Sequence, residues 1–370
     1  MSAGGSLPRV AVDRSAAPGA LHGVRVVDLS RLVAGNMLTL QLGDFGADVI
    51  KVESAGSGDT LREWCEPHPS RPEGFDGWWQ VYGRNKRSLA LNLRDPQAMG
   101  WLRRLIDTAQ VMIESFKPGT LEAMGLAPQT LHASNPKLVL VRLSGWGQSG
   151  PYRGLPGFGS LIEGFSGYAH RHRDAEGVPR LPDMALADMV TGLTGAFATL
   201  AALREVEVRG GVGQVIDLSL LEPMVAIMGP DVTNLVETGR EPKVAAKIAS
   251  PRGSYRCRDG RWIALSGSTD TMARRVFEAI GASDAFEQPR FATNAARLAN
   301  DTEVDRMVAA FVAGRDRADV LAQLRDRGVT VAPIHGPADL VTDPHVVERG
   351  VFVSLEDEAG GSAVVMHDVV

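Results

Sequence analysis

The sequence predicts an α/β protein in which a large domain holds a parallel sheet and a smaller domain follows. Three observations lead to this prediction. Apolar strands alternate with helices from residue 24 to residue 219, a pattern typical of βαβ units. The sequence becomes more polar after Pro242. The length of 370 residues exceeds what one domain of about 100–200 residues needs.

The elements of the large domain follow in chain order. Residues 24–29 are an apolar run typical of a buried strand, residues 36–45 have the apolar spacing of a helix, and residues 46–52 are a second apolar run. Two strands joined by one helix within about 30 residues favour parallel pairing. The alternation continues with a helix at 96–108, a strand at 109–114, a helical turn at 130–134, a strand at 138–143, an apolar helix at 185–203, a strand at 215–219 and a helix at 220–236.

The elements of the smaller domain have a different order. A hairpin at 253–260 leads into a strand at 262–266. Two or three polar helices are expected between residues 269 and 327, before a strand at 329–333. Runs of strands followed by runs of helices indicate an α+β arrangement.

These patterns predict a division of the chain into two domains. We expect a small domain at residues 223–330, inserted into a discontinuous large domain. The large domain would consist of residues 22–222 and 331–370, after a disordered leader at residues 1–21.

The composition excludes several classes of protein. Lys plus Arg is 39 and Asp plus Glu is 44, so the net charge of −5 offers nucleic acid no general attraction. Cys65 and Cys257 are too few for a disulfide framework, which favours a reduced, cytoplasmic protein. The longest nearly apolar run, Met189–Leu203, is shorter than the roughly 20 residues that span a bilayer. We therefore expect neither a nucleic-acid nor a membrane partner.

Common catalytic and cofactor motifs are missing from the sequence. The loop at residues 30–36 holds one glycine where a dinucleotide-binding fold carries three, and the glycines at 210–213 precede a strand instead of a helix. The histidines form no zinc-binding pattern, so no metal site is expected. No Gly-x-Ser-x-Gly segment marks a hydrolase nucleophile.

Two features leave their function open at this point. Asp188 lies at the start of the apolar helix predicted at 185–203, where it could be a helix N-cap or a carboxylate nucleophile. The segment from Arg84 to Arg94 carries several cations around a short strand. These cations could bind a phosphorylated ligand or form a solvated charged edge.

Eight segments together resemble the class III CoA-transferases, the family of formyl-CoA and carnitine CoA-transferases, whose close relatives are the α-methylacyl-CoA racemases. They occur in the family's order from residue 23 onward, and the ordered set is more specific than any one segment. The segments are residues 23–30 (GVRVVDLS), 42–53 (LGDFGADVIKVE), 85–93 (NKRSLALNL), 114–119 (ESFKPG), 145–152 (GWGQSGPY), 156–158 (PGF), 187–192 (ADMVTG) and 213–221 (GQVIDLSLL).

The resemblance implies a doubly wound large domain, two interlocked subunits in a homodimer and Asp188 as the catalytic residue. It implies no permanently bound cofactor, with coenzyme A and acyl-CoA as substrates beside a carboxylic acid. Lys117 and Arg94 would be partners for the CoA phosphates. The implied CoA-binding residues are Val33, Ala34, Leu91, Asn92, Leu93, Arg94, Ser115, Phe116 and Lys117, and the loop of Pro156, Gly157, Phe158 and Gly159 would approach the reacting thioester.

The resemblance also separates the possible activities. A transferase would move CoA from an acyl-CoA donor to a free acid through an aspartyl-CoA thioester. The related racemases place a histidine thirty residues before the aspartate, where this chain has Phe158, which cannot move a proton. Gly159 departs from relatives with a carboxylate there, and residues 251–261 lack the polyglycine loop of formyl-CoA transferase. We expect a CoA-transferase; an acyl-CoA racemase or an inactive CoA-binding paralogue remain alternatives.

Overall fold

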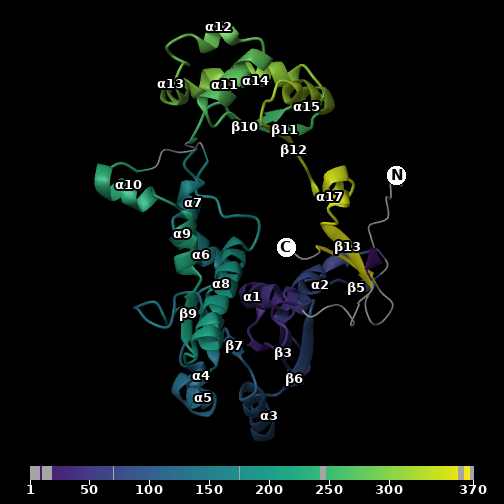
Figure 1. The fold of residues 1–370 in the computed structure, drawn as a ribbon, viewed down its shortest axis with the longest axis vertical. Coiled ribbons are helices and arrows are strands. Elements are labelled where there is room, and N and C mark those ends of the chain that lie inside the picture. The colour runs from purple at the N-terminus through teal and green to yellow at the C-terminus, as the bar shows by residue number, and fades with distance from the viewer. Residues whose placement is uncertain are drawn as a thin grey trace. The chain divides into compact units, whose positions relative to one another are not determined.

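The computed structural model describes residues 9–10, 19–69, 71–174, 176–241, 247–356 and 362–366 (Figure 1). The chain divides into two compact units. The larger unit contains residues 9–244 and 353–370, and the smaller unit contains residues 245–352. Of the predicted leader, residues 9–10 form a short strand and residues 19–21 a turn; its remaining residues lie outside the described ones.

A six-stranded parallel sheet forms the centre of the larger unit. Its strand order is β6-β3-β2-β7-β8-β9, and every neighbouring pair is parallel. The chain adds strands outward in one direction from β2 and in the other from β7, so the sheet is doubly wound. The strands are β2 (Arg25–Leu29), β3 (Asp48–Ser54), β6 (Lys86–Leu91), β7 (Val111–Glu114), β8 (Val139–Ser144) and β9 (Val215–Ser219).

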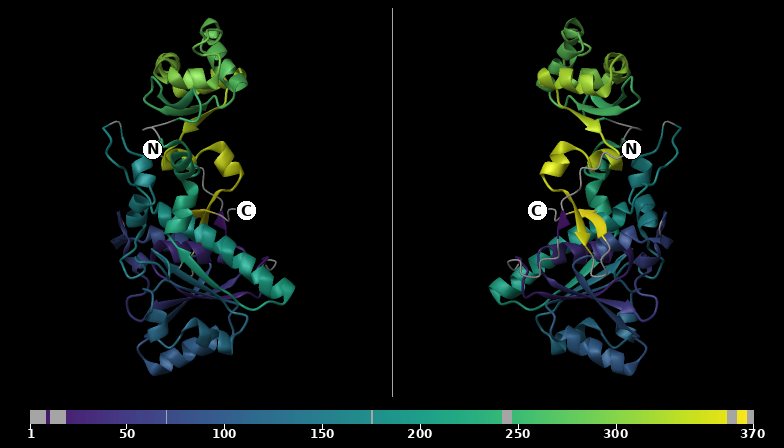
Figure 2. Two further views of the ribbon diagram at one scale, coloured as in Figure 1. Left: turned by 90° about the vertical axis from the view of Figure 1, so that its left-hand side faces the viewer. Right: turned by 90° about the vertical axis from the view of Figure 1, so that its right-hand side faces the viewer.

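Helices cover both faces of this sheet, as Figure 2 shows. Alternate strand residues enter two different cores, because successive side chains of a strand point to opposite faces. Val26 packs in the core under α1 and α8, whereas Val27 packs in the core under α3, α4 and α5. The bounds of these helices are α1 (Leu32–Asp44), α8 (Leu186–Arg209), α3 (Pro96–Ile106), α4 (Thr120–Ala123) and α5 (Pro128–Ser134).

Helix α8 is long and apolar enough to cross a membrane by length and composition alone. The same properties belong to the core helix of a globular protein. Gly192 lies against Met37 and the carbonyl of Ala34, and Gly195 lies against Leu38, so small residues let α8 pack closely on α1. Helix α8 is therefore a core helix of this unit.

Several predicted helices differ from the structure in their bounds; the helix predicted at 185–203, for example, extends to Arg209. The helix predicted at 220–236 is two helices, α9 (Leu221–Ile227) and α10 (Asp231–Thr238). The helix is interrupted at Gly229, whose φ is +66°, and at Pro230, which has no N–H to donate. Helix α1 begins at Leu32 instead of residue 36, because hydrogen bonds with Asp59 and Asn36 hold the backbone of Leu32.

The other elements of the larger unit lie around this layered core. Strand β1 pairs in parallel with β13. Strand β4 pairs antiparallel with β5. The elements are β1 (Arg9–Val10), η1 (Thr60–Glu63), β4 (Glu66–His68), β5 (Arg71–Phe75), α2 (Gly77–Tyr82), α6 (Gly159–Phe165), α7 (Tyr168–Arg171), β13 (Phe352–Glu356) and β14 (Ser362–Met366).

The smaller unit is an antiparallel sheet of order β10-β11-β12 with helices packed on it. Its core includes Tyr255, Ile263 and Val308. The elements are β10 (Arg252–Arg256), β11 (Trp262–Ser266), α11 (Asp270–Ala279), α12 (Ser283–Phe286), α13 (Asn294–Ala299), α14 (Asp301–Ala313), α15 (Arg317–Asp326), β12 (Val331–Ile334), α16 (Pro337–Leu340) and α17 (Pro344–Glu348).

The parallel sheet and the separate small antiparallel sheet confirm the predicted α/β class. The unit bounds differ from the expected small domain at 223–330. Residues 223–244 group with the larger unit, because α9 packs on α8. Residues 331–352 group with the smaller unit, because β12 pairs with β11.

Candidate functional site

The strand order of the larger unit creates a crevice between β2 and β7. These strands lie side by side, but the chain leaves them toward opposite edges of the sheet. Ligands of open α/β sheets bind outside the carboxyl ends of the strands at such a switch point. The backbone N–H of Arg31, after β2, donates to the Ser115 Oγ, after β7, at 3.1 Å. The two loops that border the crevice are thereby joined.

Two cavities open at this edge of the sheet. The first has a volume of about 510 Å³ and includes Asp188, Arg31, Lys117 and Arg153 in its lining. The second has a volume of about 590 Å³ and extends along the ends of β3 and β6. Arg31 and Phe116 line both cavities. A long ligand could therefore occupy the two cavities together.

Asp188 is the third residue of α8, and its carboxyl group faces the first cavity. The helix N-cap is Ala185, so Asp188 does not have the N-cap position that the sequence left open. The backbone N–H groups of Ala34, in the first turn of α1, and of Asp188 itself lie near enough to this carboxylate to lower its pKa. A Cβ at Gly159 would lie 2.4 Å from the Asp188 Oδ2, so a side chain at this position would displace this oxygen.

The environment of Asp188 changes its acidity. Burial raises the pKa of Asp188 to about 6, the N–H of Ala34 opposes this rise, and the nearby Glu163 carboxylate adds to it. A carboxylate with this pKa is mostly ionised at neutral pH and is more basic than an ordinary aspartate. Such a group is suited to nucleophilic attack.

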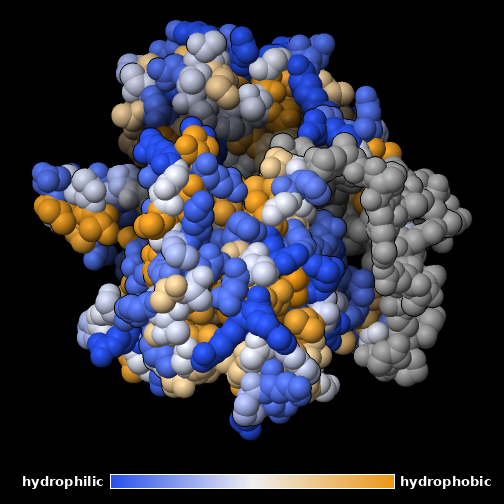
Figure 3. Space-filling model, turned by 60° about the horizontal axis from the view of Figure 1, so that its bottom comes forward, coloured by the Kyte–Doolittle hydropathy of each residue, from blue (hydrophilic) through white to orange (hydrophobic). Residues whose placement is uncertain are grey.

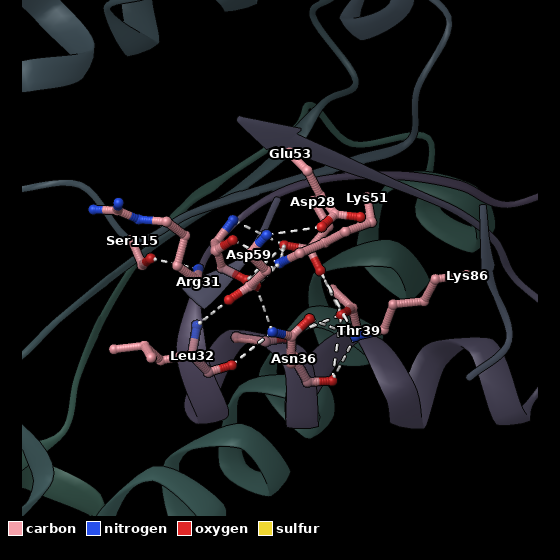
Figure 4. Close-up of polar contacts among 12 residues, drawn as sticks. Asp28, Arg31, Leu32, Asn36, Thr39, Lys51, Glu53, Asp59, Lys86 and Ser115 are labelled. Atoms are coloured by element: carbon pink, nitrogen blue, oxygen red, sulfur yellow. Dashed lines mark hydrogen bonds and ion pairs between the residues drawn. The ribbon is translucent and has the colours of Figure 1, made fainter. Parts of the chain in front are cut away.

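A buried network of charges fixes the loop between β2 and α1 (Figure 4). The Lys51 ammonium lies 3.3 Å from the Asp28 Oδ1 and 3.1 Å from the Asp59 Oδ2, and the three side chains are almost fully buried. Lys51 also donates to the Ser30 carbonyl at 2.6 Å. Burial works to raise the pKa of Asp28, but the Lys51 and Lys86 ammonium groups hold it below its ordinary value. The buried carboxylates of Asp28 and Asp59 are thus balanced by the ammonium groups of Lys51 and Lys86.

This network explains why α1 begins at Leu32. Leu32 has a φ of +63°, a conformation that costs a residue with a Cβ about 1 kcal/mol or more. Asp59 accepts its N–H at 3.1 Å, and the Asn36 amide donates to its carbonyl at 2.6 Å. Because these contacts hold Leu32, the helix starts early and brings the Ala34 N–H to Asp188.

A second buried cation supports the loop after β7. Arg142 on β8 donates to Glu114 at 2.9 Å and to Glu122 at 2.7 Å. Glu114 in turn accepts the N–H of Phe116 at 2.7 Å. The segment that carries Ser115, Phe116 and Lys117 is therefore attached to the sheet by an ion pair.

The basic segment from Arg84 to Arg94 does not act as one ligand-binding group. Arg84 pairs with Asp44 and Arg87 with Asp48. Lys86 is buried and donates to the Asn36 side chain at 2.8 Å, and burial lowers its pKa to about 7. Only the end of this segment, Leu91 to Arg94, lines the second cavity.

The structure brings most of the expected site residues to these cavities. Gly159 contacts Asp188 without lining a cavity, and Val33 is buried in α1 at 1% exposure. Among the residues described, no group of His, Cys, Asp and Glu side chains could hold a metal ion. The first cavity is lined by Asp188, Ala34, Ser115, Phe116, Lys117, Pro156, Gly157 and Phe158, and the second by Leu91, Asn92, Leu93, Arg94 and Phe116.

Sequence reasoning missed several residues of this site. Arg31 and Arg153 line the first cavity without any motif that marks them. The buried network left a signal, because Asp28 and Lys51 interrupt apolar strands that are otherwise suited to a buried sheet. Glu163 left no such signal, since an isolated glutamate in a short helix is ordinary.

The chain is similar in sequence to known CoA-transferases and in fold to solved structures. The succinyl-CoA–D-citramalate CoA-transferase of Chloroflexus aurantiacus is 34% identical over 95% of this chain and 87% of its own. The succinate–glutarate CoA-transferase of Agrobacterium fabrum is 34% identical over 92% of this chain and 86% of its own. The crystal structure of a CAIB/BAIF family protein from Brucella suis has a TM-score of 0.82 at 30% identity, covering 96% of this chain and 93% of that one.

The family assignment extends over nearly the whole sequence. The crystal structure of Rv3272 from M. tuberculosis has a TM-score of 0.84 at 27% identity, covering 95% of this chain and 93% of that one. Residues 21–370 match CoA-transferase family III. With the relatives above, this match confirms the resemblance seen in the eight sequence segments. The chain belongs to CoA-transferase family III and is a class III CoA-transferase enzyme.

Proposed function

We propose that this enzyme moves CoA from an acyl-CoA donor to a free carboxylic acid through an aspartyl-CoA thioester on Asp188. The observation that carries the proposal is the position of Asp188. It lines a cavity at the sheet's switch point, with the Ala34 N–H of α1 near its carboxylate and space for its oxygen at Gly159. This is the arrangement that a carboxylate nucleophile needs.

The exchange follows from what this carboxylate can do. The Asp188 carboxylate attacks the donor thioester, which gives an aspartyl–acyl anhydride and releases CoA thiolate. The thiolate attacks the Asp188 carbonyl, which forms the aspartyl-CoA thioester and releases the donor acid as its carboxylate. The acceptor carboxylate attacks this thioester, giving a second anhydride and CoA thiolate. The thiolate then attacks the acceptor's carbonyl, and Asp188 regains its negative charge.

The protein's part in these steps is to position the reactants and stabilise charge. The Ala34 N–H lies near the carboxylate that becomes the reacting carbonyl, so we expect it to stabilise the developing oxyanion. The two cavities together suit CoA, with Arg94 in the second and Lys117 in the first as partners for its phosphates. The thiol end of CoA would then reach Asp188.

We further propose a dicarboxylic acid as the acceptor. Two relatives carry succinate, glutarate or citramalate in their names. Arg31, Lys117 and Arg153 line the first cavity, and none of them has a carboxylate partner among the residues described. If Lys117 binds a CoA phosphate, Arg31 and Arg153 remain, and Arg153 lies just before the loop of Pro156 to Gly159 that would approach the thioester. Its guanidinium can bind the second carboxylate of the acid in a bidentate manner.

A panel of paired acids tests this specificity. We expect succinate to be accepted in preference to butyrate, which has the same chain length but one carboxylate. Arg153→Ala should raise the KM for succinate by about tenfold, as the loss of one charged hydrogen bond would. Arg204→Ala, at an exposed position of α8, is the control. Equal effects of Arg153→Ala on succinate and butyrate would contradict the assignment.

The alternative of a racemase has no support in the site. Phe158 stands where the racemase design needs a histidine. No histidine lines either cavity among the described residues. Deuterium incorporation at the α carbon of an acyl-CoA in heavy water would nevertheless reveal that activity.

We also propose that the enzyme is a homodimer, with the interlocked arrangement that the resemblance implied. Leu193, Phe197 and Leu200 form an exposed apolar stripe along α8, and Phe197 is 75% exposed. Figure 3 shows further apolar residues gathered along α10, at the left of the view. Large exposed apolar surfaces mark protein interfaces. Light scattering should give a mass of two chains, and Phe197→Asp should shift the mass toward one chain.

Trapping the intermediate tests the mechanism directly. Incubation with an acyl-CoA should attach CoA to Asp188, as seen by mass spectrometry, and hydroxylamine should remove it. Asp188→Ala should form no adduct yet still bind CoA by calorimetry. A wild-type protein that binds CoA but forms no adduct and exchanges no CoA with any acid would indicate the inactive paralogue instead.

A further inference from the structure

A buried carboxylate lies beside the partly buried Asp188 and takes no part in the exchange described above. Glu163, on α6, is 3% exposed. Its Oε1 accepts the N–H of Ala187 at 3.0 Å. No cation pairs with Glu163 among the residues that the structure describes. Its recorded partner is thus a backbone N–H at the start of α8, the helix that carries Asp188, and this places a second carboxylate next to the proposed nucleophile.

Helix α6 fixes the nucleophile at two points. Glu163 holds Ala187, the residue directly before Asp188, by accepting one of the free N–H groups in the first turn of α8. Gly159, the first residue of α6, lies against the Asp188 Oδ2. Glu163 and Asp188 therefore share one helix N-terminus, with α6 setting both the position and the surroundings of the Asp188 carboxyl group.

The other groups that face Asp188 do not supply a compensating positive charge. Helix α1 contributes the Ala34 N–H, and α2 contributes Tyr82, a phenol whose pKa is raised by burial and in part by Asp188. Arg31, Lys117 and Arg153 line the same cavity, but none of them forms an ion pair with Asp188. Among the described residues, Glu163 is thus the charged group that perturbs Asp188, and its negative charge raises the pKa of Asp188.

We propose that Glu163 is a positioning residue that holds Asp188 through Ala187 and whose negative charge makes the Asp188 carboxylate a stronger nucleophile. This inference rests on the proposed function of Asp188. Repulsion between the two carboxylates is present while Asp188 is free. It disappears once Asp188 becomes a neutral anhydride or thioester. The charge of Glu163 therefore destabilises the free enzyme relative to the covalent intermediates and lowers the barrier to attack.

Two substitutions separate the hydrogen bond from the charge. Glu163→Gln keeps an oxygen that can accept the Ala187 N–H but removes the negative charge. Glu163→Asp keeps the charge but has a shorter side chain, so the contact with Ala187 is lost. Glu207→Gln is the matched control, because Glu207 is an exposed glutamate near the far end of α8. If Glu163 only capped the helix, Glu163→Gln would leave the titration of Asp188 unchanged.

The first measurement needs no turnover. The protein is labelled with ¹³C at the aspartate carboxyl carbon, and the Asp188 signal is identified by its loss in Asp188→Asn. We expect its titration midpoint to fall by about half a pH unit or more in Glu163→Gln, to stay near the wild-type value in Glu163→Asp, and to be unchanged in Glu207→Gln. An unchanged midpoint in Glu163→Gln would overturn the proposal, whether or not CoA exchange is observed.

The second measurement follows CoA exchange between pH 5 and pH 9. We expect Glu163→Gln to lower kcat above pH 7 by about three- to tenfold, with the KM for acyl-CoA unchanged, and to move the acidic limb of the profile to lower pH. A wild-type kcat and pH profile for Glu163→Gln would refute the role of the charge. Absence of exchange in the wild-type enzyme would instead count against the proposed function, while the titration would still test the link between Glu163 and Asp188.

Discussion

Gly159→Ala should disable the nucleophile with little effect on the fold. The new Cβ would lie 2.4 Å from the Asp188 Oδ2, whereas ordinary van der Waals contact begins at 3.4 Å. The oxygen must therefore move by about 1 Å, and a displacement of this size can reduce the rate about 100-fold. That loss corresponds to about 2.7 kcal/mol in the activation barrier.

The structure also predicts which properties the substitution leaves unchanged. Gly159 has no left-handed φ, so alanine fits its backbone conformation, and the atom it meets belongs to a side chain that can rotate. We expect the free energy of unfolding to change by less than about 1 kcal/mol. The KM for acyl-CoA should stay within about twofold, because uniform substrate binding does not depend on the Asp188 oxygen.

A control on the same helix makes the experiment decisive. A Cβ at Gly164, also on α6, would meet no atom within 4 Å, so Gly164→Ala should have wild-type activity. Initial rates of CoA exchange, urea unfolding and CoA titration would be measured for both variants. Wild-type kcat in Gly159→Ala, or an equal loss in Gly164→Ala, would refute the view that Gly159 makes room for the nucleophile.

Three further predictions concern ionisation and stability. The proposed attack needs the ionised form of Asp188, whose pKa is about 6. We therefore expect kcat/KM to fall tenfold per pH unit below pH 6 and to level off above it. A profile that is flat from pH 5 to pH 8 would contradict this. The raised pKa also means that native Asp188 resists ionisation, so stability is lost as pH rises from 3.8 toward 6. Asp188→Asn should therefore raise the free energy of unfolding at pH 7.5 by up to about 3 kcal/mol, and this gain should shrink toward pH 4 in urea titrations. Lys51→Met leaves Asp59 buried without its cation and Asp28 with only the more distant Lys86, so it should lower the free energy of unfolding by about 3–5 kcal/mol. Lys117→Met should change it by less than about 0.5 kcal/mol, and equal losses would argue against the buried network.

The sequence predicted those parts of the protein that depend on neighbouring residues. Apolar periodicity identified the strands at 24–29 and 138–143, and short-range composition separated the more polar part after Pro242 from the part that forms the parallel sheet. The ordered motifs identified the family and singled out Asp188. Its place near the start of an apolar helix was visible because helix periodicity is a local property.

Tertiary structure decided what the sequence could not, because the deciding contacts join residues far apart in the chain. Leu32 begins α1 only because Asp59 holds its N–H, and the strand order β6-β3-β2-β7-β8-β9 alone brings Arg31 beside Ser115. The same holds for Glu163, whose carboxylate reaches Ala187 from another helix. Local patterns identify residues able to do chemistry, whereas burial and distant charges determine their acidity and position. The sequence thus named the proposed nucleophile, and the packing of α1 and α6 around it set its position and acidity.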